Sequence, residues 1–70
     1  MKLCVRVLRH EKGHYTAVCP SLPGCLARGQ TCREAVVLMD EAIRGYLAAV
    51  GEFVPGSIEQ EVEEVPAAQA

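Results

Sequence analysis

Between Leu3 and Leu8, apolar side chains recur at every second position. A period of two predicts a β-strand with one buried face. The polar stretch Glu11-Lys12-Gly13 then supplies the glycine-containing turn of a hairpin. A second strand is expected over residues 14–19, which are rich in Tyr, Thr and Val. Its alternation leaves open whether Tyr15-Ala17-Cys19 or Thr16-Val18 is the buried set.

A rigid elbow follows, with the sequence Cys19-Pro20-Ser21-Leu22-Pro23-Gly24-Cys25. Each proline fixes its own φ at about −65° and pushes the preceding residue toward extended geometry. Gly24 can take a positive φ without the steric cost that other residues meet. The elbow has a fixed shape but little chemistry, which favours a binding surface over a catalytic centre.

A capped amphipathic helix is predicted after a short third strand over residues 25–28. Thr31 and Glu34 match a capping box, and the helix is expected from about Cys32 to about Val50. Gly51 is the residue expected just past its end. Gly45 lies inside the helix and suggests a close approach to the sheet or to another subunit. The apolar positions form a stripe at helical spacing, made of Ala35, Leu38, Met39, Ala42, Ile43, Tyr46, Ala49 and Val50.

The end of the chain is more polar. Residues 58–65 are expected to form a charged edge strand, and residues 66–70 a frayed, disordered end. Residues 1–65 then make one α+β domain in the order β-β-β-α-β. We expect a small antiparallel sheet with the helix on one face. The other face would carry Cys4 and Leu8, and an uncovered apolar face favours self-association.

The size and charge of the chain indicate how it would associate and what kind of partner it would attract. A 70-residue chain is marginal as an isolated domain, and small cores often need association. Arg6 interrupts the first apolar run, so no signal peptide or membrane span is expected, and we expect a cytoplasmic protein with reduced cysteines.

Residues 1–51 hold all seven Lys and Arg and four of the nine acids, whereas residues 52–70 hold five acids and no base. The acidic end would attract a basic partner.

No arrangement of residues predicts an enzyme. The four cysteines lack the close pairs of zinc sites, so free core thiols are favoured, although Cys19 and Cys25 flank the elbow and could pair or bind metal. His10 and His14 bracket the first turn and are expected to be exposed to solvent. No phosphate-binding loop is present. We therefore expect no catalytic residue, no metal and no cofactor.

The elbow and the helix start together resemble a known family. The residues concerned run from Tyr15 through Cys25, then Gly29-Gln30-Thr31, Glu34-Ala35, Glu41-Ala42 and Tyr46-Leu47. This pattern resembles the HicB-like antitoxin domain over nearly the whole chain. The resemblance implies a partial ribonuclease H fold without the metal-binding carboxylates. It also implies binding and neutralisation of a small basic toxin that cleaves messenger RNA.

Two departures from that family stand out. The sequence stops at Ala70, without the C-terminal DNA-binding domain that many members carry, so no direct DNA binding is expected. Ser21 occupies a position in the elbow where family members often have an acidic residue. The contact that such a carboxylate would make with a partner is therefore in doubt.

Three hypotheses follow from the sequence. The first is an antitoxin-type binding module, which is not an enzyme. Its partner-binding residues would be Pro20, Ser21, Leu22, Pro23 and Gly24 of the elbow and Glu59, Glu61 and Glu63 of the last strand. The second is an orphan homo-oligomer, a dimer or tetramer, without a toxin partner. The third, remote hypothesis is a residual metal-dependent nuclease.

Overall fold

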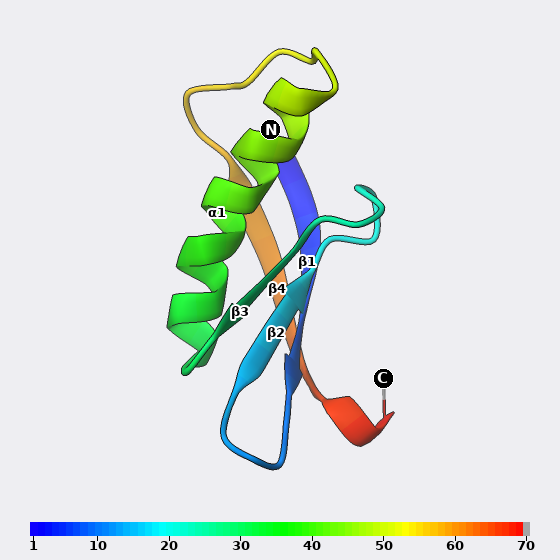
Figure 1. Ribbon diagram of the computed structural model, residues 1–70, viewed down its shortest axis with the longest axis vertical. Coiled ribbons are helices and arrows are strands. Elements are labelled where there is room, and N and C mark those ends of the chain that lie inside the picture. The colour runs from blue at the N-terminus through cyan, green and yellow to red at the C-terminus, as the bar shows by residue number, and fades with distance from the viewer. Residues whose placement is uncertain (70) are drawn as a thin grey trace.

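The computed structural model describes residues 1–69, which form a four-stranded sheet covered on one face by one long helix (Figure 1). The elements occur in the predicted order β-β-β-α-β. Their bounds are β1 Lys2–Arg9, β2 Tyr15–Val18, β3 Leu26–Gly29, α1 Cys32–Ala49, β4 Glu59–Pro66 and the 3-10 turn η1 Ala67–Gln69. The α+β class expected from the sequence is confirmed.

The sheet has the strand order β3-β2-β1-β4. β1, β2 and β3 pair antiparallel, as expected for sequential strands joined by short turns. β4 instead pairs parallel with β1, with Val5 opposite Val62. The sheet is therefore mixed, because α1 carries the chain back across the sheet before β4 begins.

The core lies between the sheet and α1. Its buried residues come from alternate positions of the strands and from one stripe of the helix, namely Val5, Val7, Ala17, Cys19, Cys25, Ala27, Ala35, Met39, Ile43 and Leu47. Ala17 and Cys19 are buried, which identifies Tyr15-Ala17-Cys19 as the inward set of β2. Thr16 and Val18 thus share the uncovered face with Cys4 and Leu8.

The caps of α1 follow its sequence closely. The Thr31 Oγ1 atom accepts from the Glu34 backbone N–H at 3.0 Å, while the Glu34 carboxylate accepts from the Gln30 N–H at 3.0 Å. Gly51 has a φ of 77°, and the N–H groups of Gly51 and Glu52 donate to Ala48 and Leu47. This pair of bonds is a Schellman motif. The predicted start and end of the helix are confirmed.

Three expectations about the elements were wrong in detail. Leu38 and Val50 are exposed, and Leu47 takes the core position that the predicted stripe omitted. Nothing lies within 4 Å of a Cβ built on Gly45, so this glycine marks no close approach to the sheet. Pro66 belongs to β4 and Ala67–Gln69 form a 3-10 turn where a frayed end was expected. Ala70 lies outside the described residues.

Candidate functional site

The elbow consists of two consecutive β-turns, each with a proline in its second position. The Leu22 N–H donates to the Cys19 carbonyl at 3.0 Å, and the Cys25 N–H donates to the Leu22 carbonyl at 2.9 Å. Gly24 has a φ of 84°, which the third position of a type II turn requires. The shape of the elbow is thus fixed by its prolines and its glycine.

Cys19 and Cys25 close the neck of the elbow. The Cys19 N–H donates to the Cys25 carbonyl at 3.3 Å, and both side chains are buried. Both thiols are free, and burial followed by the nearby Cys19 raises the pKa of the Cys25 thiol. The Cys25 thiol also lies 3.8 Å from the Met39 sulfur. These cysteines occupy core positions beneath the elbow.

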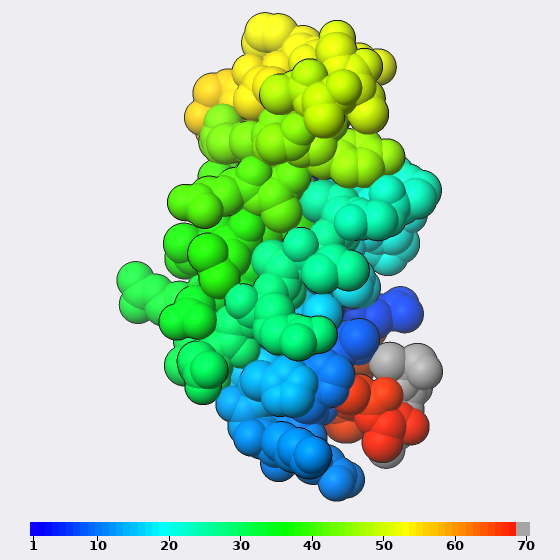
Figure 2. Space-filling model, viewed as in Figure 1, coloured from blue at the N-terminus to red at the C-terminus, as the bar shows by residue number. Residues whose placement is uncertain are grey.

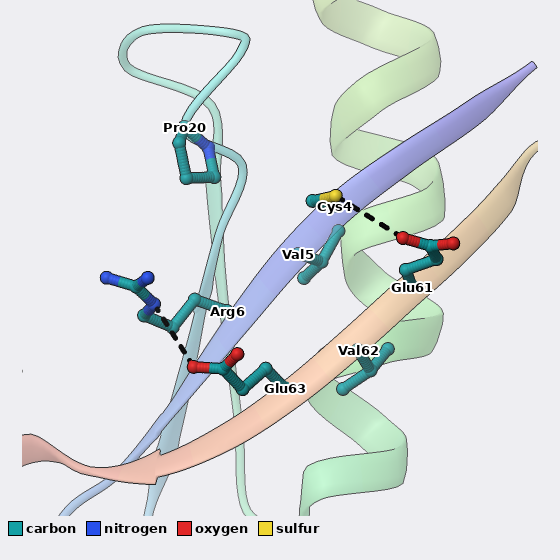
Figure 3. Close-up of a pocket in the computed structure, with 7 residues that line it drawn as sticks. All are labelled: Cys4, Val5, Arg6, Pro20, Glu61, Val62 and Glu63. Carbon is teal, nitrogen blue, oxygen red and sulfur yellow. Dashed lines mark hydrogen bonds and ion pairs between the residues drawn. The ribbon is translucent and has the colours of Figure 1, made fainter.

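One face of the elbow lies near β4, the strand that carries Glu61 and Glu63. Pro20 lines a shallow pocket of about 240 Å³ on the uncovered face of the sheet. Figure 3 shows the Arg6, Cys4, Glu61 and Glu63 side chains around this pocket, with α1 behind the strands. Two of the three predicted acidic residues thus join Pro20 in one place. Glu59 does not line this pocket and lies at the start of β4.

The acids of β4 already have partners within the chain. Lys2 Nζ lies 2.8 Å from Glu61 and Arg6 Nε lies 3.9 Å from Glu63. The Lys2 hydrogen bond, and after it the Cys4 thiol, hold the pKa of the Glu61 carboxyl below its ordinary value of 4.5. These pairs form because β4 lies parallel to β1 in a register that places Glu61 opposite Cys4 and Glu63 opposite Arg6, so both acids share one face of the sheet with Lys2 and Arg6. In the sequence, Lys2 and Arg6 fall on one face of the first strand. Glu61 and Glu63 likewise fall on one face of the last strand, and this is the feature that could have suggested their adjacency.

The other face of the elbow borders an apolar hollow. Leu22 is half-buried and packs against the core. With Met1, Tyr46 and Val50 it lines a hollow of about 560 Å³ at the end of α1. Phe53 lies at this hollow and is 81% exposed. Figure 2 shows the elbow lying against the last turns of the helix. This apolar hollow was not predicted from the sequence.

The remaining predicted site residues are spread out. Ser21, Pro23 and Gly24 form the exposed tip of the elbow. Thr31 and Glu34 lie at the helix start, where they act as caps. Within residues 1–69 no three His, Cys, Asp or Glu side chains are grouped so that they could hold a metal ion. No helix in the described part of the chain is long and apolar enough to cross a bilayer.

Comparison with known proteins identifies the family. A UPF0150 protein from Thermoplasma acidophilum is 35% identical over 65 residues, which cover 89% of this chain and 94% of that relative. The chain belongs to the UPF0150 family. A second UPF0150 protein, from Archaeoglobus fulgidus, is 34% identical over 59 residues, or 77% of this chain and 86% of the relative. No protein-family model matches the chain, and no solved structure matches it significantly.

Proposed function

We propose that this UPF0150 protein is a non-catalytic binding module that neutralises a small basic, RNA-cleaving toxin. The resemblance of its elbow and helix start to HicB-like antitoxins supports this proposal. The observation that carries it is the position of the elbow between two unlike surfaces. One is the acidic pocket around Pro20, Glu61 and Glu63. The other is the apolar hollow around Leu22 and Phe53.

The two surfaces suit a partner that is both basic and apolar. The side chains of Glu61 and Glu63 remain 54% and 69% exposed within their ion pairs, so an incoming cation can share them. Exposed pairs of this kind contribute little to stability, and exchanging their partner therefore costs little. A highly exposed aromatic residue beside a hollow is the kind of anchor that dominates binding energy.

The proposal is tested by asking whether the protein inhibits RNA cleavage by its partner, and not only whether it binds that partner. The tagged protein is purified from its native lysate, and a stoichiometric small basic partner is identified by mass spectrometry. The proposal expects that this partner alone cleaves RNA, that the UPF0150 protein suppresses cleavage, and that high salt separates the two. Phe53→Ala should weaken inhibition at least tenfold. Val37→Ala, which truncates another exposed apolar residue on the outside of α1, should leave it unchanged.

Two results would overturn the proposal. One is a basic partner whose RNA cleavage continues at equimolar UPF0150 protein. The other is the absence of any basic partner even when neighbouring reading frames are co-expressed.

A second candidate is an orphan homo-oligomer built through the uncovered face of the sheet. Half-buried Leu8, Val18 and Val65 lie there beside Leu26, which is 56% exposed. Light scattering at tens of micromolar (about the range in which small domains associate) tests it directly. A dimer or tetramer that becomes monomeric on Leu26→Glu supports this candidate, and a monomeric parent protein excludes it.

A further inference from the structure

The β1–β2 hairpin brings two histidines together. The Gly13 N–H donates to the His10 carbonyl at 3.1 Å, and Gly13 has a φ of 89°. A three-residue loop of this kind leaves the residues that flank it directly opposite each other. The His10 N–H accordingly donates to the His14 carbonyl at 2.9 Å, and the two imidazoles stack with centroids 4.2 Å apart. They are half-buried, so the sequence-based expectation that both are exposed was wrong.

Further polar groups surround the stacked rings. His10 Nε2 lies 2.9 Å from Thr16 Oγ1, which holds its ring over the uncovered face. Arg28 is the β3 partner of Thr16, and Lys12 lies in the turn. Within residues 1–69 the basic side chains of Lys2, Arg6, Arg9 and Arg44 form ion pairs, whereas Lys12, Arg28 and the helix residue Arg33 form none. The hairpin therefore concentrates hydrogen-bond donors and positive charge, with Glu11 as the acid of its turn.

An open hollow of about 780 Å³ adjoins these groups. One wall consists of Arg9, His10, Glu11, Lys12 and His14, and the other of Pro66, Ala67 and Ala68. The η1 turn and the hairpin lie at the same end of the molecule (Figure 1). The small residues Pro66, Ala67 and Ala68 thus face the charged and imidazole side chains of the hairpin across the hollow. Such a hollow has room for a group much larger than water.

We propose that this hollow is a binding site for a phosphate group. Lys12 lines the hollow and supplies positive charge, and the two imidazoles in its wall supply hydrogen bonds. Arg28, opposite Thr16 on β3, lies beside this wall rather than in it and adds positive charge near His14. A phosphate would neutralise Lys12, which forms no ion pair among the described residues, and would add to the negative charge that Glu11 places in the turn. The site lies at the opposite end of β1 from the elbow, so its test does not depend on the function proposed for the elbow.

Binding at this site should be coupled to proton uptake. Partial burial, and after it the charges of His10, Arg28 and Lys12, lower the pKa of His14 from its ordinary 6.5. The other charged groups here are Glu11 in the turn and the pair between Arg9 and Glu64, whose atoms are 3.7 Å apart. A bound dianion favours the imidazolium form and raises the His14 pKa. Affinity for a phosphodiester, whose single charge does not change in this range, should therefore increase as the pH falls through the histidine range. Inorganic phosphate gains a proton over the same range, which offsets this increase.

The experiment follows the histidine ring protons by NMR during titration with inorganic phosphate, at ionic strength fixed with chloride. We expect saturable shifts of His10 and His14 and a rise in the His14 pKa. Each unit of that rise implies about tenfold tighter binding to the protonated form. Lys12→Ala and Arg28→Ala should each weaken binding several-fold. Arg33→Ala, which removes an exposed charge on the helix outside this cluster, should not.

A second titration with a single-stranded RNA oligonucleotide identifies the source of the phosphate. Shifts of the same resonances at much lower RNA concentration assign the site to RNA phosphodiesters, and shifts with inorganic phosphate alone assign it to free phosphate. The proposal fails if neither ligand shifts the two rings saturably. It also fails if Lys12→Ala and Arg28→Ala bind as tightly as Arg33→Ala.

Discussion

Two glycines show how single positions control the packing of the helix on the sheet. A Cβ built on Gly29 would lie 2.7 Å from the backbone nitrogen of Ala35. The end of β3 and the first turn of α1 touch here through their backbones. Gly45 has open space around it instead. A glycine within a helix suggested close contact, but the contact that needs a glycine lies at the end of a strand.

We predict opposite effects of alanine at these two positions. Gly29→Ala should destabilise the protein by about 1–3 kcal/mol, because backbone atoms cannot move aside as a flexible side chain can. Gly45→Ala should stabilise it by about 0.5–1 kcal/mol through helix propensity alone. Urea unfolding of both variants measures the difference. A neutral Gly29→Ala would show that β3 and α1 are packed less closely than described here.

At the scale of elements, the hydrophobic period predicted most of the fold. Each strand and the helix were located within one or two residues, since period-two alternation, two prolines and a capping box are local signals. The parallel pairing of β4 was missed because pairing across α1 is a long-range property. The stacking of His10 and His14 was missed for a related reason. It depends on the register of the hairpin, which the Gly13 turn sets.

The acidic residues of the candidate site were named from the sequence, but the side chains that surround them were not predicted. Composition pointed to Glu61 and Glu63, yet their pairing with Lys2 and Arg6 depends on the strand order. The apolar hollow at Phe53 was not found because one aromatic residue after a helix has no periodic pattern. The elbow could therefore be found from the sequence, whereas the two surfaces beside it could be described only from the three-dimensional structure.

The connection between α1 and β4 depends on one arginine. Arg44 donates to the Asp40 carboxylate at 2.9 Å and to the backbone carbonyls of Pro55 and Gly56 at 2.8 and 3.2 Å. Asp40 and Arg44 lie one helical turn apart, and their pair also aims the guanidinium at the loop. This fork fixes the return of the chain toward β4, whose first N–H, that of Glu59, bonds to the Met1 carbonyl at 2.7 Å.

We predict that Arg44→Ala and Arg44→Lys both weaken this connection. Alanine removes all three hydrogen bonds, and the ammonium group of lysine cannot reproduce the planar geometry with which the guanidinium donates to three acceptors. The loss should be about 1–2 kcal/mol, below the value for fully buried charged hydrogen bonds since the side chain is one-third exposed. Faster hydrogen exchange at Glu59 would place the effect at the start of β4. Arg33→Ala is the matched control and should change stability by less than about 0.5 kcal/mol. Full protection of Glu59 in Arg44→Ala would contradict the prediction.

For the whole molecule, two ionisable groups set separate pH windows of stability. The pKa of His14 is lowered from 6.5, so the unfolded chain binds a proton there more readily than the folded chain. Stability should therefore fall as the pH decreases below the ordinary histidine value. The pKa of Glu61 is lowered from 4.5, so its contribution is present above that value and is lost only as the pH falls further.

The prediction is a two-step decline of the urea midpoint, measured in phosphate-free buffer from about pH 7.5 to pH 3. His14→Gln should flatten the step between about pH 7 and pH 5 and leave the lower step unchanged. Glu61→Gln should do the reverse, because it removes the carboxylate that Lys2 stabilises. If phosphate binds at the hairpin, adding it should restore the midpoint in the upper window only. If the upper step is still present in His14→Gln, the step belongs to another ionisable group. The prediction that His14 makes the stability pH-dependent in this range would then be wrong.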